Sequence, residues 1–196
     1  MKASSLLVLF CLLSVILCDT TGITTQALKS SFKDGLSYIK AFHTKFYTLG
    51  KGILTKVTLT NPLLTENNVD FKIENGHVKV IFQNMKLTLS GNAKIKKSQF
   101  TELTKFGAHL ENTKFEVTYN VSSQKLSSGK YEVKFSKTFE SALTFKVAKL
   151  TSKFTGLTDI EDQLKTKIIA LDFTAYKNDL VKIANLVLET LPNHMK

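Results

Sequence analysis

The 196-residue sequence carries 27 basic and 16 acidic residues, for a formal net charge of +11, and 43% of its residues are hydrophobic. All 27 basic residues are lysine, and the absence of arginine, the usual bidentate reader of guanine and phosphate, argues against nucleic acid as a partner. The positive charge suits an anionic membrane surface or lipid headgroup, and it equally suits a lysine-rich solubilising surface.

The N-terminus has the pattern of a secretory signal peptide. The apolar run Leu6–Leu17 has the length of a signal-peptide core and is shorter than the roughly 20 apolar residues that a spanning helix needs. Cleavage is expected after Cys18, with Gly22 as an alternative. We therefore expect a signal peptide over 1–18, one domain over 19–196, and a secreted, extracellular protein.

Both cysteines, Cys11 and Cys18, lie in the segment that would be removed. The mature chain would then have no disulfide, so its core must be large enough to be stable alone.

The first element after this segment is a predicted helix over 25–49. Thr24 or Thr25 can cap its start, and Gly50-Lys51-Gly52 would end it. Apolar residues at spacings of three and four form one stripe, as on an amphipathic helix: Leu28, Phe32, Leu36, Ile39, Phe42, Phe46 and Leu49.

The apolar period then changes to two, which predicts seven or eight strands in succession. Asn75-Gly76 is a strong hairpin signal, Asn84 marks a phase shift or bulge, Ser90-Gly91-Asn92 predicts a bend, and residues 122–129 read as a polar loop. One face of these strands is apolar and the other is polar, which is typical of an antiparallel meander covered on one side. The apolar runs are Val57–Leu59, Val69–Ile73, Val78–Phe82, Met85–Leu89, Phe106–Leu110, Phe115–Tyr119, Tyr131–Phe135 and Leu143–Val147.

A second helix is predicted over 157–191, with a bend or break at Lys177-Asn178-Asp179 and an end at Pro192. Its apolar side would comprise Leu157, Ile160, Leu164, Ile168, Leu171, Leu180, Ile183 and Val187. An apolar sheet face needs a cover, and a twisted sheet curls. The predicted fold class is therefore α+β: an elongated antiparallel sheet curled around two long helices, N-terminal and C-terminal, as a tubular half-barrel.

Catalytic patterns are absent from the sequence. The four histidines are scattered, no known catalytic or nucleotide-binding motif is present, and Glu161-Asp162 fits a helix first turn, where acids favour the helix dipole. We expect no enzymatic activity, no cofactor and no metal site.

Two surface features carry further predictions. Asn120-Val121-Ser122 is an N-glycosylation sequon at an expected strand end. A basic cluster comprises Lys94, Lys96, Lys97 and Lys105. This cluster could contact an anionic membrane or glycolipid, or it could be a charged edge that prevents strand aggregation.

Three stretches, together with the order of elements, resemble a known family. They are Gly-Leu-Ser-Tyr at 35–38, the strand over 82–91, and Leu-Glu-Thr-Leu-Pro at 188–192. They are similar to the N-terminal domain of the bactericidal/permeability-increasing and lipopolysaccharide-binding proteins, in the tubular lipid-binding (TULIP) superfamily. This chain lacks the family's disulfide and second domain, so it resembles a short single-domain form.

The resemblance implies a tunnel between sheet and helices that holds phospholipid, lipopolysaccharide or another apolar ligand, and it implies a basic tip at the lysine cluster. Our first hypothesis is a secreted non-enzymatic lipid-binding or lipid-transfer protein. The alternative is a cationic, antimicrobial host-defence protein of innate immunity that binds anionic membranes or lipopolysaccharide. The expected cavity lining, which could equally be a packed core, is Leu36, Ile39, Phe42, Phe46, Val80, Phe82, Leu87, Leu89, Val117, Phe145, Val147, Leu164, Ile168 and Leu171.

Overall fold

The computed structural model describes residues 23–43, 46–49, 52–60, 64–97, 100–128, 131–153 and 156–194. The expected signal peptide over 1–18 lies outside these residues. The helices are α2 (Thr25–His43), α3 (Thr158–Ile169) and α4 (Thr174–Thr190), with short 3-10 helices η1 (Glu66–Asn68) and η2 (Leu191–His194). The strands are β1 (Phe46–Thr48), β2 (Leu54–Thr60), β3 (Val69–Glu74), β4 (His77–Gln83), β5 (Leu87–Lys97), β6 (Phe100–Lys125), β7 (Tyr131–Glu140) and β8 (Thr144–Ser152).

Strand β6, with 26 residues, is the spine of one antiparallel sheet. Strands β5 and β4 pair with successive halves of β6 along one edge, and β8 and β7 do the same along the other. The main path runs β1-β2-β5-β6-β4-β3, so the predicted simple meander is wrong in its strand order. The meander prediction assumes that each strand pairs with its neighbours in sequence. Strand β6, with 26 residues, is instead long enough to pair with four strands.

The sheet is interrupted halfway along both edges of β6. Asn84, between β4 and β5, and Asn112, opposite it on β6, have positive φ angles of 55° and 51°. The Thr113 hydroxyl bridges the gap, because it accepts from Met85 N at 2.6 Å and donates to Met85 O at 2.8 Å. The predicted phase shift at Asn84 is confirmed, and such irregularities increase local twist and allow a long sheet to curl.

The predicted bend at Ser90-Gly91-Asn92 is wrong, because β5 runs through it without interruption. A Cβ atom on Gly91 would lie 2.9 Å from the Val57 Cα atom of neighbouring β2. Glycine is therefore present for close approach of two strands rather than for a turn. By contrast, the Asn75-Gly76 hairpin is confirmed, with both residues at positive φ between β3 and β4.

The first helix starts as predicted and ends earlier. Thr24 Oγ1 accepts from Ala27 N at 3.0 Å, which is an N-terminal cap. The helix stops at His43, and residues 46–48 form β1, which pairs with β2. Of the two stripe residues predicted there, Phe46 therefore lies in the edge strand β1 and Leu49 directly follows it, since so short a stretch cannot distinguish the two periods.

The predicted second helix is two helices, α3 and α4, and the break lies at 170–173 rather than at Lys177-Asn178-Asp179. Asp179 is only 3% exposed and lies inside α4. Asp179, which the sequence suggested as a helix break, is therefore a buried polar residue within a continuous helix. The helix end before Pro192 is confirmed, with η2 following directly.

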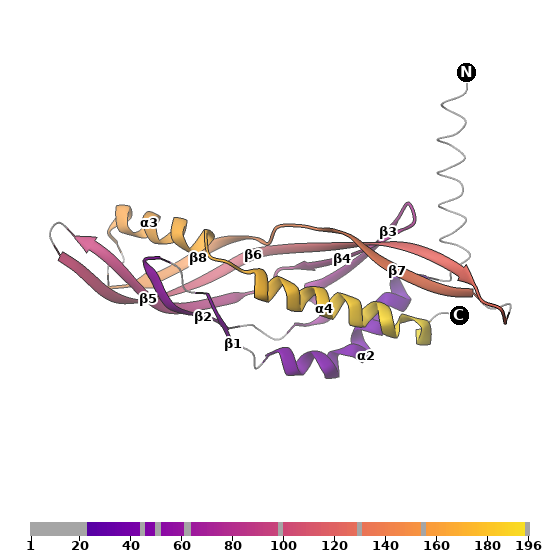
Figure 1. Ribbon diagram of the computed structural model, residues 1–196. Helices are drawn as coiled ribbons and strands as arrows, with labels where there is room; N and C mark the ends of the chain where they lie inside the picture. The colour runs from indigo at the N-terminus through magenta and orange to yellow at the C-terminus, as the bar shows by residue number, and fades with distance from the viewer. Residues whose placement is uncertain are drawn as a thin grey trace, which may run out of the picture.

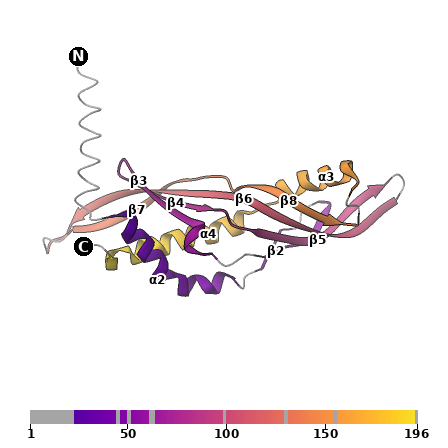
Figure 2. The same cartoon turned by 180° about the vertical axis from the view of Figure 1, so that it is seen from behind.

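Helices α2 and α4 lie side by side along one face of the sheet, and α3 lies beside β8 nearer the other end (Figure 1). Seen from behind, the hairpin ends of β5–β6 and β6–β7 extend past the helices at opposite ends of an elongated molecule (Figure 2). The predicted α+β class, an elongated curled antiparallel sheet with helices on one face, is confirmed. None of the helices within the described ranges is long and apolar enough to cross a membrane.

Candidate ligand-binding site

Most of the predicted cavity lining lies together in one buried cluster between sheet and helices. Val80, Phe82, Leu87, Leu89, Val117, Leu164 and Ile168 have no exposed surface, and Leu171 is 6% exposed. Phe145 and Val147 are partly buried against the same cluster. The side chains of Leu36, Ile39, Phe42 and Phe46 lie outside the part of the chain that the structure describes. The seven side chains with no exposed surface are surrounded by protein atoms, so no water-sized cavity adjoins them.

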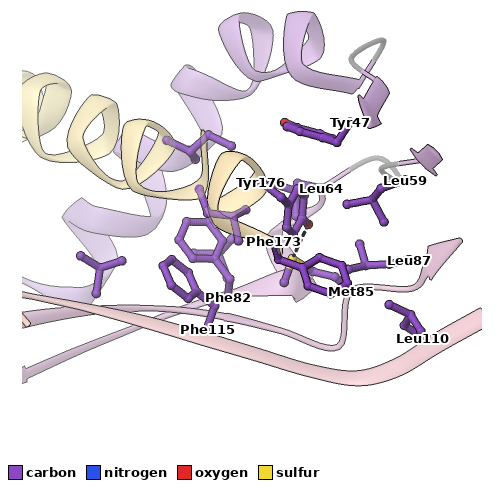
Figure 3. Packing of buried hydrophobic residues seen from close by; sticks show 14 of the residues in the cluster. Tyr47, Leu59, Leu64, Phe82, Met85, Leu87, Leu110, Phe115, Phe173 and Tyr176 are labelled. Carbon is purple, nitrogen blue, oxygen red and sulfur yellow. Dashed lines mark hydrogen bonds between the residues drawn. The ribbon is translucent and has the colours of Figure 1, made fainter. Parts of the chain in front are cut away.

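Aromatic rings fill the interior between α4 and the sheet (Figure 3). Phe82 and Phe115 lie 6.2 Å apart between ring centroids, and Phe145 meets Phe173 edge-to-face at 5.1 Å. Tyr176 donates a hydrogen bond to Met85 Sδ at 3.3 Å, the contact drawn in Figure 3. These contacts hold α4 and the segment before it against the centre of the sheet.

A buried carboxylate ties α4 to the edge strand β1. The Tyr47 hydroxyl donates to Asp179 Oδ2 at 2.6 Å, and the Tyr47 ring packs edge-to-face on Tyr176 at 5.4 Å. Lys182 Nζ lies 3.1 Å from the other Asp179 oxygen. Burial, and then the hydrogen bond to Asp179, raise the pKa of Tyr47 well above its ordinary value. The phenol therefore stays protonated and keeps donating at physiological pH.

Two further polar contacts fix the second half of α4. The Tyr119 hydroxyl of β6 donates to Asn185 Oδ1 at 2.6 Å. The buried Ser31 hydroxyl of α2 donates to the carbonyl of Val187. Helix α4 therefore has a polar attachment to β1, to β6 and to α2, and polar groups paired in this way fix one register more strictly than apolar packing does.

A pocket of about 450 Å³ lies between the C-terminal part of α4, β6 and β7. Its apolar lining is Val133, Phe135, Leu188 and Pro192, and its polar lining is Tyr119, Lys137, Asn185 and Glu189. Leu188 and Tyr119, both 3% exposed, belong to the core cluster, whereas Asn185, Glu189 and Pro192 are exposed. The pocket therefore leads from the surface down to the core, and its volume is typical of small-molecule sites.

None of these eight residues was among the predicted lining. Val133 and Phe135 were predicted only as strand residues, and Leu188 and Pro192 only as part of the closing motif of a helix. Leu188 lies next to Val187 of the predicted apolar stripe, so helical periodicity alone could have predicted that its side chain points inward. The meeting of β7 with the end of α4 has no signature in the sequence.

Charges around the pocket are nearly balanced. Lys137 Nζ and Lys177 Nζ lie 2.9 Å and 3.3 Å from the two carboxylate oxygens of Glu140. The hydrogen bond from Lys137, more than that from Lys177, lowers the pKa of Glu140 below its ordinary value of 4.5. Burial, followed by the charge of Glu140, raises the pKa of Tyr119. The pocket thus presents a protonated phenol beside the Lys137–Glu140 pair, and Glu189 adds a further acidic side chain to the lining.

The predicted basic cluster lies on the end of the sheet formed by β5 and β6. Lys94, Lys96 and Lys105 are exposed, and the side chain of Lys97 lies outside the described residues. Leu103 is 60% exposed and sits directly opposite Lys94, while Lys105 faces Asn92 and Lys96 faces Thr101. Facing residues of paired strands share a face of the sheet, so three lysines surround one exposed leucine.

Asn120 of the sequon is exposed, and it lies inside β6, paired with β4 on one side and β7 on the other. The predicted strand end is wrong here, because β6 continues to Lys125 and takes in the first half of the predicted polar loop. The described residues contain no group of three or more His, Cys, Asp or Glu that could hold a metal ion.

No protein-family model and no curated protein matches this sequence. Among solved structures, the crystal structure of Takeout 1 from Epiphyas postvittana is similar, with 17% identity over 85% of this chain and 85% of that chain and a TM-score of 0.28.

Proposed function

We propose that this chain is a secreted, non-enzymatic protein of the tubular lipid-binding type, which binds or transfers a lipid or similar apolar molecule. The observation that carries the proposal is the pocket beside α4, whose floor is continuous with an apolar interior enclosed by a curled sheet and two helices. The resemblance in the sequence and the observed order of helix, strands and helices support the same reading.

The interior is packed where its side chains are described, so the ligand enters at the pocket and deeper insertion requires α4 to move away from the sheet. Val133 and Phe135 are partly exposed at the pocket and would contact the apolar part of the ligand. Burying apolar ligand surface contributes roughly 25 cal/mol per Å². Affinity of such a site depends on ligand apolar area and little on salt.

Native and denaturing mass spectrometry of the protein secreted from eukaryotic cells tests this function. We expect a co-purifying lipid that is released on denaturation, and we expect Val133→Phe, which fills the pocket, to reduce its occupancy. Ser136→Phe is the matched control, because Ser136 is exposed and alternates with the pocket-lining residues of β7. A protein that is empty, and that also fails to take up fluorescent fatty acid or phospholipid, contradicts the proposal.

The same spectra test secretion and modification. A signal peptide cleaved after Cys18 gives a mature chain that begins at Asp19. Glycosylation at Asn120 gives a mass increment that is removed by an N-glycosidase and is absent in Asn120→Gln. A retained N-terminal segment, or an unmodified Asn120, rejects the corresponding part of the proposal.

A second candidate function is binding to anionic membranes, as in a cationic host-defence protein. It rests on the exposed Leu103 among Lys94, Lys96 and Lys105, an arrangement that combines an apolar anchor with charge attraction. Glu102, on the same hairpin, is already paired with Lys153. The three lysines therefore face an approaching surface without an ion-pair partner among the described residues.

Co-sedimentation with phosphatidylcholine vesicles, with and without phosphatidylglycerol, tests this candidate. Each lysine near an anionic surface contributes about 1 kcal/mol, so Lys94→Glu/Lys96→Glu should weaken binding at least tenfold, a figure on the order of two such contributions. The control is Lys29→Glu/Lys167→Glu, the same charge change on α2 and α3. Equal losses in both variants, or binding that does not fall with salt, contradict a specific tip.

A further inference from the structure

The polar half of the pocket beside α4 has a defined hydrogen-bonding pattern. Asn185 Oδ1 accepts from the Tyr119 hydroxyl at 2.6 Å, and both residues line the pocket. An amide has two N–H donors in addition to its oxygen. Among the residues that the structure describes, no acceptor takes either N–H of Asn185, so the pair offers donors to whatever occupies the pocket.

The charges at the pocket disfavour an anionic ligand end. Lys137 is the one cation among the described lining residues, and it already pairs with Glu140 at 2.9 Å. Glu189 adds a carboxylate to the same lining. A ligand carboxylate would meet Glu189 without an unpaired cation to compensate, whereas an uncharged acceptor would meet no such repulsion.

The Tyr119 hydroxyl and the Asn185 amide both keep their protons across physiological pH. Burial raises the pKa of Tyr119, so the phenol remains protonated and continues to hold the oxygen of Asn185. The amide of Asn185 does not titrate. The hydrogen bonding of this pair is therefore independent of pH, whereas the exclusion of an anionic ligand end also depends on the charges of Lys137, Glu140 and Glu189.

We propose that the Tyr119–Asn185 pair selects the polar end of an uncharged amphiphile, one that accepts a hydrogen bond, such as a fatty ester or fatty alcohol, over the free fatty acid. This rests on the proposed lipid-binding function and names the ligand class for that site. Val133, Phe135 and Leu188 contact the hydrocarbon part, and the amide N–H groups of Asn185 donate to the ester or hydroxyl oxygen.

Competition against the hydrocarbon probe diphenylhexatriene tests the inference with three ligands of equal chain length: methyl dodecanoate, dodecanol and dodecanoate. We expect the ester and alcohol to displace the probe at lower concentration than the acid at neutral pH. Asn185→Asp keeps the acceptor for Tyr119 and removes both donors, so it should weaken the ester, which can only accept, by about three- to tenfold, the effect of one lost hydrogen bond. The alcohol should lose less, because its hydroxyl can donate to the new carboxylate. Probe affinity should not change, since the probe has no polar group.

Asn178→Asp is the matched control, because it makes the same chemical change on an exposed residue of α4 that does not line the pocket. The inference is overturned if Asn185→Asp binds the ester as tightly as wild type does, if wild type binds the acid as tightly as the ester, or if Asn178→Asp causes the same loss. A wild-type protein that binds neither the probe nor any competitor refutes the proposed function itself. Thermal unfolding of both variants establishes that each is folded before its affinities are compared.

Discussion

Replacing Tyr47 with phenylalanine removes one oxygen atom from the contact between β1 and α4. The lost hydroxyl donates to the buried carboxylate of Asp179 at 2.6 Å, while the ring and its edge-to-face contact with Tyr176 at 5.4 Å remain. A hydrogen bond to a charged group contributes about 1.5–3 kcal/mol. The ion pair to Lys182 cannot replace it, because the Lys182 side chain is 64% exposed and such pairs contribute little. We expect Tyr47→Phe to lower the free energy of unfolding by about 2 kcal/mol.

Urea unfolding followed by circular dichroism measures this change. With a slope of about 2 kcal/mol per molar urea, the midpoint should fall by about 1 M while the slope stays constant. Tyr176→Phe is the matched control, since it removes a buried hydroxyl that donates to the uncharged Met85 Sδ at 3.3 Å. Its cost should stay below about 1 kcal/mol. A Tyr47→Phe midpoint equal to that of wild type, or above that of Tyr176→Phe, would refute the reasoning from the buried carboxylate.

Gly91→Ala should destabilise the fold by about 2 kcal/mol, because the new Cβ would lie 2.9 Å from the Val57 Cα atom. Gly35→Ala, inside α2 with room for a Cβ, should raise stability by up to about 1 kcal/mol; thermal melts distinguish them, and equal melting temperatures would contradict both. Glu140→Gln should reduce the acid sensitivity of the protein. The pKa of Glu140 is lower in the folded protein than its ordinary value of 4.5, because Glu140 pairs with Lys137. This pairing stabilises the fold at pH values above 4.5, and the stabilisation is lost as the pH falls through the folded-state pKa. The stability difference between wild type and Glu140→Gln should therefore shrink below pH 4.5, and a difference independent of pH would reject this role.

Local pattern was sufficient for much of this fold. The alternation at Val78, Val80 and Phe82 predicted an inward face, and all three side chains are fully buried. Asn75-Gly76 and Asn84 were correctly placed because positive φ is strongly residue-dependent. The α+β class followed from the order of the two periodicities, since each amphipathic element must bury one face against another.

Tertiary structure decided the features on which the proposed site depends. The sequence around Gly91 reads as a turn, and only the approach of β2 shows why glycine is needed there. Asp179 reads as a helix break, and only the Tyr47 hydroxyl from β1 explains its burial within α4. The pocket joins β7 to the end of α4, and its Tyr119–Asn185 pair links residues 66 positions apart. Periodicity and turn chemistry are local properties that a sequence displays directly. Close backbone approach, buried polar pairs and pockets arise between distant segments, and their partners become visible only once the chain has folded.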